Sequence, residues 1–130
     1  MLDASALLCY LNAEDGAEVV QEALGNGAWI GIVNWAEVLS KTAEEGGDPE
    51  VLESRLTDLG LLGEVLRVAP FTRDEALTIG RLRPLTRDKG LSLGDRACLA
   101  LGLRLELPIY TADRTWESLD VGADVRLVRS

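Results

Sequence analysis

Histidine is absent from the 130 residues of this chain, and cysteine occurs only twice. Without an imidazole there is no serine–histidine–aspartate triad and no ribonuclease mechanism based on paired histidines. There is also no ordinary zinc site, because two isolated cysteines do not complete tetrahedral ligation. Both cysteines, Cys9 and Cys98, fall in apolar helical stretches, so we expect them to be buried small hydrophobic residues. Acid, base and metal chemistry must therefore come from carboxylates.

The sequence also lacks a basic leader and any apolar run long enough to cross a bilayer. We therefore expect a soluble, cytoplasmic protein with no membrane contact. Asp and Glu number 22 against 13 Lys and Arg, which gives a formal net charge of −9. Such a charge argues against non-specific coating of nucleic acid, because affinity for phosphates comes mainly from clustered cations. Any nucleic acid would have to bind to a local patch of basic residues.

Short strand-like segments alternate with longer amphipathic segments, and no repeat, low-complexity tract or linker divides them. This order predicts one domain over residues 1–130 of the α/β class, a three-layer α/β/α sandwich with a short, mainly parallel sheet. We expect strands over residues 1–4, 28–33, 65–69, 108–111 and 124–128. Helices are expected over residues 34–45, from Asp48-Pro49 onward, 72–83 and 92–105.

Four acidic residues stand where strands are expected to end and helices to begin. Asp3 closes the first strand and Asp113 follows the strand 108–111, whereas Glu37 and Asp95 fall in first helical turns. Strand ends and helix starts share one edge of a parallel sheet, so these four carboxylates are expected to share one pocket. Each acid also has a purely structural interpretation, either as a helix cap or as the third residue of a capping box beginning at Asn34 or Ser92.

Convergence on one edge favours a metal site, because capping alone does not require all four acids to lie together. Clustered carboxylates repel one another unless a cation neutralises them. All-oxygen ligands select Mg²⁺ or Mn²⁺ over zinc. Such an ion lowers the pKa of a coordinated water, which favours hydrolysis of a phosphodiester to 5′-phosphate and 3′-hydroxyl ends.

Four stretches of the chain, in order, carry a family resemblance: LDASALL at 2–8, NWAEV at 34–38, LSLGDRACLAL at 91–101 and YTADRTW at 110–116. Together they resemble the PIN-domain ribonucleases, specifically the VapC toxins of type II toxin–antitoxin systems. Only two residues precede Asp3, so the first strand is shorter than is usual in that family.

The resemblance implies an endoribonuclease with an acidic, catalytic metal site made of Asp3, Glu37, Asp95 and Asp113. It implies that Ser5 and Thr111 hold the hydrogen bonds of this site. It also implies a VapB-like antitoxin partner, whose C-terminal segment lies across the site, and a homodimer. The assignment of RNA as substrate comes from the resemblance, because attack by water does not itself require a ribose 2′-hydroxyl.

Basic residues close to the acids in sequence are candidates for phosphate contacts: Lys41, Arg87, Lys89, Arg96 and Arg114. The alternatives are that Lys41 pairs with Glu37 along one helix, and that Arg87 and Lys89 only solvate a loop. Trp116 has the residue type to stack a base, although packing in the core is favoured for it.

Two other functions fit parts of the pattern. A phosphatase or phosphotransferase with an aspartate nucleophile also uses a first-strand aspartate and Mg²⁺. The segment Asp3-Ala4-Ser5 lacks the second acid expected there, and neither Lys41 nor Lys89 follows a strand as required. A catalytically inactive PIN-like binding domain is the other alternative, and the presence of all four acids argues against it.

Overall fold

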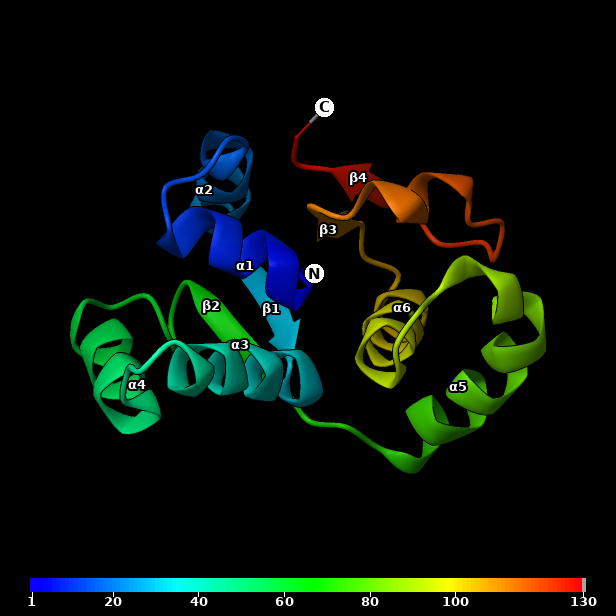
Figure 1. The fold of residues 1–130 in the computed structure, drawn as a ribbon, viewed down its shortest axis with the longest axis horizontal. Helices are drawn as coiled ribbons and strands as arrows, with labels where there is room; N and C mark the ends of the chain where they lie inside the picture. The colour runs from blue at the N-terminus through cyan, green and yellow to red at the C-terminus, as the bar shows by residue number, and fades with distance from the viewer. Residues whose placement is uncertain (130) are drawn as a thin grey trace.

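A short parallel sheet forms the centre of the computed structural model, which describes residues 1–129 (Figure 1). Strand β1 (Ala28–Gly31) pairs in parallel with β2 (Leu66–Ala69), in a register that places Ile30 opposite Val68. Strands β3 (Ile109–Thr111) and β4 (Val125–Leu127) form a second parallel pair.

Leu2 joins the two pairs of strands. It forms one parallel bridge to Ile30 and another to Tyr110, so the order across the sheet is β2, β1, Leu2, β3 and β4. Its N–H donates to Trp29 O over 2.7 Å, and the N–H of Asp3 donates to Tyr110 O over 3.1 Å. The N-terminal segment is therefore the middle of the sheet, and Asp3 lies directly beside the end of β3.

Neighbouring residues along the strands belong to two different hydrophobic cores, because successive side chains of a strand point to opposite faces. Leu2 and Ile30 belong to one core, whereas Met1 belongs to the other and Trp29 packs against that second core. Each face of the sheet thus has its own layer of helices, and the predicted α/β/α sandwich is confirmed.

The first core is covered by four helices, which contribute Leu7, Val20, Val38 and Leu56 among others. These helices are α1 (Ala4–Leu11), α2 (Ala17–Gly25), α3 (Ile32–Glu44) and α4 (Pro49–Asp58).

The second core is covered by α5 (Arg73–Leu85), α6 (Leu93–Leu105) and the 3₁₀ helix η2 (Arg114–Ser118). A second 3₁₀ helix, η1 (Arg87–Lys89), is exposed between α5 and α6. Helix α6 lies against the sheet at the end of β1. A Cβ atom added at Gly31 would lie 2.5 Å from Leu101 Cδ1, so only glycine permits this approach. The close packing brings the first turn of α6 next to the first turn of α3.

Most of the predicted elements are present, and two predictions about the chain near the site are wrong. Residues 1–4 do not form a strand: Leu2 alone makes the bridges, and α1 already begins at Ala4 with Asp3 as its N-cap. The expected strand 28–33 ends at Gly31, and α3 begins at Ile32, so Asn34 lies within the helix and does not cap it. Helix α1 contains Cys9, in agreement with the helical stretch expected around that residue, and helix α2 is additional to the predicted elements.

Other expectations are met. Asp48 caps α4 through the N–H of Glu50, and Ser92 with Asp95 forms a capping box at the start of α6. Cys9 and Cys98 are buried free thiols. None of the helices formed by residues 1–129 is both long and apolar enough to cross a membrane.

Candidate metal centre

Asp3 is the most enclosed of the four predicted acids, with 4 % of its surface exposed. Its Oδ1 accepts hydrogen bonds from the Ala6 N–H and the Ser5 hydroxyl, both over 2.8 Å. Its Oδ2 accepts from the Thr111 hydroxyl over 2.5 Å. The bond from Ala6 is an ordinary N-cap. The two hydroxyl bonds are additional, and they orient both carboxylate oxygens.

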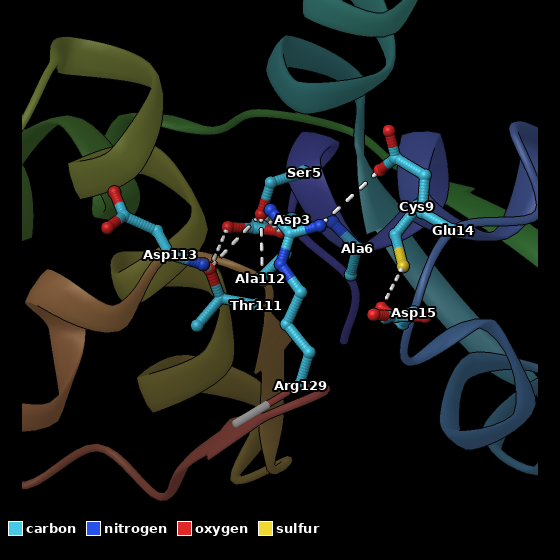
Figure 2. Close-up of polar contacts among 10 residues, drawn as sticks. All are labelled: Asp3, Ser5, Ala6, Cys9, Glu14, Asp15, Thr111, Ala112, Asp113 and Arg129. Carbon is cyan, nitrogen blue, oxygen red and sulfur yellow. Dashed lines mark hydrogen bonds and ion pairs between the residues drawn. The ribbon is translucent and has the colours of Figure 1, made fainter.

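Ser5 and Thr111 also tie the segment after β3 to the start of α1, as Figure 2 shows. Ser5 Oγ accepts from the Ala112 N–H over 2.9 Å, and Thr111 Oγ1 accepts from the Asp113 N–H over 3.1 Å. The two hydroxyl oxygens are 3.2 Å apart. The predicted supporting residues therefore connect Asp3 to the backbone that carries Asp113.

Glu37 lies on α3 and faces the first turn of α6. Its Oε1 accepts a hydrogen bond of 2.8 Å from Asn34 Nδ2, and the same nitrogen donates to Gly94 O over 3.0 Å. A Cβ atom added at Gly94 would lie 2.5–2.7 Å from the Glu37 carboxylate atoms. The carboxylate therefore packs directly against the backbone that leads into Asp95.

Asp95 is held by the capping box of α6. Its Oδ2 accepts from the Ser92 N–H over 2.9 Å, while its own N–H donates to Ser92 Oγ over 3.1 Å. The charge of Asp95 raises the pKa of both Asp3 and Glu37. Asp95 thus lies within electrostatic reach of the two other acids.

Burial is the main cause of the raised pKa values in this cluster. It raises the pKa of Asp3 to about 6, although the hydrogen bonds from Thr111, Ala6 and Ser5 act in the opposite direction. Burial also raises the pKa of Glu37, against the hydrogen bond from Asn34. On the neighbouring α6, burial raises the pKa of the Cys98 thiol, and the charges of Asp3, Asp95 and Glu37 raise it further. The charges of three carboxylates therefore act on the same buried thiol of α6.

Asp113 has a different environment. Its Oδ1 accepts from the N–H and the hydroxyl of Thr115, over 2.9 and 2.8 Å, so the side chain caps η2. In Figure 2 its carboxylate lies on the side of its backbone away from Asp3. It is linked to Asp3 through its N–H and the Thr111 hydroxyl.

The four acids do not form a ready-made cage. Within residues 1–129, no group of three or more His, Cys, Asp or Glu side chains is arranged to hold a metal ion. The donor chemistry nevertheless fits a hard cation, because Mg²⁺ usually retains several waters and uses one or two carboxylates directly. A buried Asp3 with a raised pKa and no cationic partner in the described chain is the kind of group that such an ion would stabilise.

The basic residues named from the sequence have different positions. Arg96 is buried, and its Nε donates to Thr86 Oγ1 over 2.9 Å, so the expectation that it contacts phosphate is wrong. Lys41 is exposed and pairs with Glu45 over 3.7 Å instead of Glu37. Arg87, Lys89 and Arg114 are exposed on η1 and η2.

Trp116 is buried in the second core, which confirms packing for this residue and leaves no ring face for a base.

Sequence reasoning missed the part played by Asn34 and Gly94. The signal for Gly94 was a glycine directly before an acid in a helical first turn, where glycine is otherwise unfavourable.

The profile of the PIN domain family matches residues 1–122. This chain belongs to the PIN domain family. Comparison with curated proteins finds no match. Comparison with solved structures finds the same fold in proteins of low sequence identity.

A toxin–antitoxin complex from Klebsiella pneumoniae contains a chain with 16 % identity and a TM-score of 0.69, covering 99 % of this PIN domain protein and 97 % of that chain. VapBC2 from Rickettsia felis, bound to a DNA fragment from its promoter, contains a chain with 15 % identity and a TM-score of 0.72, covering 98 % of this chain and 96 % of the other. VapBC-5 from Mycobacterium tuberculosis contains a chain with 20 % identity and a TM-score of 0.52, covering 80 % of this chain and 98 % of the other. The PIN fold therefore accounts for nearly the whole chain.

Proposed function

We propose that this PIN domain protein is a Mg²⁺- or Mn²⁺-dependent endoribonuclease and the toxin of a toxin–antitoxin pair. The observation that carries the proposal is the buried Asp3 carboxylate, which accepts only from uncharged donors among residues 1–129 and lies, with Glu37, within reach of the charge of Asp95. A fold needs no such concentration of negative charge for its stability, and it loses free energy by maintaining it.

The proposed metal ligands are Asp3, Glu37, Asp95 and Asp113. A divalent cation at this position supplies a Lewis acid that acidifies water and stabilises negative charge on a phosphodiester. The protein's own contribution is to hold the oxygens in place. The hydroxyls of Ser5 and Thr111 orient Asp3, and the Ser92 N–H orients Asp95. The inclusion of Asp113 is supported by the bond from its N–H to Thr111 Oγ1, the hydroxyl that also donates to Asp3.

We further propose that exposed cations near these acids meet the phosphates of an RNA strand. Arg87 and Lys89 lie on η1, which leads into α6, and Arg114 lies on η2 directly after Asp113. The two segments are neighbours, because Lys89 Nζ lies 3.4 Å from Ser118 Oγ. Lys41 is the candidate on α3. Such contacts position a strand without reading its sequence.

The proposed protein partner is a VapB-like antitoxin, and the toxin is proposed to be a homodimer. The solved structures that share the fold are toxin–antitoxin complexes. An apolar groove of about 740 Å³ lies between α1, α2 and the chain that follows α4, and it is lined in part by Tyr10, Leu11, Leu24 and Leu59. Leu59 is 74 % exposed, which leaves apolar surface for a partner helix. Native mass spectrometry after co-expression with the adjacent small gene measures both assemblies.

The test of the enzymatic proposal compares wild type, Asp95→Asn and Asp88→Asn on cellular RNA with Mg²⁺, with Mn²⁺ and with chelator. Asp88 is an exposed acid on η1 and serves as the matched control. We expect metal-dependent cleavage by wild type and Asp88→Asn, and a loss of about a hundredfold or more in Asp95→Asn, because even outer-shell changes at metal sites cost 10–100-fold.

Equal cleavage by all three proteins would remove Asp95 from the mechanism. Turnover of p-nitrophenyl phosphate without RNA cleavage would favour the phosphatase alternative. RNA binding without cleavage under every metal condition would favour an inactive binding domain.

A further inference from the structure

Asn34 connects the two helices that carry Glu37 and Asp95. It lies in the first turn of α3, is 1 % exposed, and donates from a single nitrogen to two acceptors. One acceptor is Glu37 Oε1 on its own helix, and the other is Gly94 O, 60 residues along the chain on α6. One amide group therefore holds a carboxylate and the neighbouring helix at the same time.

The orientation of this amide is fixed by its partners. Glu37 Oε1 and Gly94 O can only accept hydrogen bonds, so the NH₂ group and not the carbonyl oxygen must face them. The other end of the amide makes no compensating contact: Asn34 Oδ1 is buried and has no hydrogen-bond partner among the described residues. Burying an unpaired oxygen costs folding free energy, which an apolar side chain of similar size would avoid. The stability of the core therefore does not explain asparagine here.

Gly94 closes the same arrangement from the other side. A Cβ atom there would lie 2.5 Å from Glu37 Oε2 and 2.7 Å from Oε1. The Glu37 carboxylate is thus confined between the Asn34 amide and the α6 backbone. Within residues 1–129, this carboxylate accepts its hydrogen bond at Oε1. Oε2 remains free to accept from a ligand.

We propose that Asn34 is a positioning residue, which orients Glu37 and fixes its separation from Asp95 so that the two carboxylates bind one divalent cation. This inference rests on the proposed function, because Asn34 is assigned as the hydrogen-bond donor that orients a ligand of the same metal site. The hydrogen bond that orients a ligating carboxylate sets metal affinity as strongly as many ligands do.

The test is a double-mutant cycle between Asn34→Leu and Glu37→Gln in the full chain, with Mn²⁺ binding measured by isothermal titration calorimetry. We expect Asn34→Leu to weaken Mn²⁺ binding by about tenfold in the wild-type background. In the Glu37→Gln background the same substitution should change binding by less than about twofold, because effects that act through one group are not additive. Chemical unfolding without metal measures the separate structural effect, in which the loss of the two hydrogen bonds from Nδ2 is partly offset by removal of the unpaired Oδ1.

Asn26→Leu is the matched control, since Asn26 is exposed at the end of α2. It should leave Mn²⁺ affinity unchanged. Asn34→Ser provides a second variant if Asn34→Leu does not fold, because a hydroxyl is too short to reach Glu37 and Gly94 together, and the same tenfold loss is expected.

The outcomes separate the two proposals. Wild-type affinity in Asn34→Leu or Asn34→Ser, alongside a loss in Glu37→Gln, would overturn the role of Asn34 and leave the metal site intact. Equal losses from Asn34→Leu in both backgrounds would show that it acts independently of Glu37 and would also overturn it. Absence of Mn²⁺ binding by the wild type would overturn both proposals.

Discussion

Asp3 and Glu75 are the two buried carboxylates among residues 1–129, and their surroundings differ in one respect. Glu75 lies at the start of α5, where Thr72 and Arg104 hold it, with Arg104 Nε 2.9 Å from its Oε2. Burial raises the pKa of Glu75, but these hydrogen bonds and the Arg104 charge outweigh it, so the pKa is lowered. Asp3 is held by uncharged groups alone, and its pKa is raised to about 6.

Both acids belong to helix caps, so the capping motif does not separate a structural acid from a functional one. The presence of a counter-ion does. A buried carboxylate with an arginine is already neutralised, whereas one without it retains its attraction for a cation from outside the chain. The predictions below test this difference.

The largest effect is expected from Asp3→Asn in the absence of divalent metal. The folded-state pKa of about 6 lies above the ordinary value of 3.8, so charged Asp3 destabilises the fold above pH 6, and this penalty disappears as the pH falls below 3.8. Asp3→Asn should therefore raise the free energy of unfolding at neutral pH by roughly 2–3 kcal/mol. Urea unfolding in chelator at neutral and acidic pH measures this difference in the free energy of unfolding. The two proteins should have similar free energies of unfolding at acidic pH. A wild type more stable than Asp3→Asn at neutral pH would contradict the prediction.

Arg104→Met should act in the opposite sense, because it leaves Glu75 buried without its cation. We expect the free energy of unfolding to fall by about 2 kcal/mol. This is less than the usual cost of breaking a fully buried ion pair, because the Arg104 side chain is 39 % exposed. The pKa of Glu75 is lowered in the folded state, so its stabilising effect is present above 4.5 and is lost as the pH falls through the lower folded-state value. Arg126→Met, in an exposed pair with Asp124, is the control and should leave the free energy of unfolding nearly unchanged. Equal losses of stability in Arg104→Met and Arg126→Met would show that burial of Glu75 does not make its ion pair more important than an exposed one.

Ser92→Ala should cost about 1 kcal/mol of stability, the usual value of an N-cap side chain. RNA cleavage should remain within about threefold of wild type, because the bond that holds the Asp95 carboxylate comes from the Ser92 N–H, which alanine retains. Thermal unfolding and cleavage rates measure the two effects. A large loss of cleavage at wild-type stability would mean that the hydroxyl itself belongs to the site.

Lys41→Ala is expected to have the smallest effect on stability, about 0.3 kcal/mol, because its pair with Glu45 is exposed. If Lys41 meets RNA phosphate, KM should rise by about threefold, and the increase should shrink at higher salt. Arg55→Ala on α4 provides a control for the loss of one exposed positive charge. An identical change in KM for both variants would reduce the role of Lys41 to overall charge.

The layers of the fold and the positions of the acids followed from local patterns. Ser92 and Asp95 form the predicted box, and the segment from Leu93 to Leu105 is helical because its apolar residues recur with helical spacing. Asp3 and Asp113 cap the elements after them, as their residue types allowed. For Asp113 the structural and the functional interpretations are compatible, because its cap uses Oδ1 and leaves Oδ2, whereas both oxygens of Asp3 accept hydrogen bonds.

The remaining features depend on contacts between distant segments. The strand expected to reach residue 33 ends at Gly31, where Leu101 of α6 packs against the backbone, and this shifts Asn34 from a cap to a donor inside the helix. Arg96 is buried because its guanidinium reaches Thr86, which no periodicity indicates. The separation of the acids likewise depends on tertiary packing.

The position of Leu2 between β1 and β3 has a consequence for biosynthesis. Its partner Tyr110 lies 108 residues further along the chain, so the middle of the sheet closes only after the C-terminal part of the polypeptide has left the ribosome. Thr111, which orients Asp3, arrives with the same segment. The hydrogen bond that orients the buried Asp3 carboxylate therefore forms only after residue 111 has emerged from the ribosome.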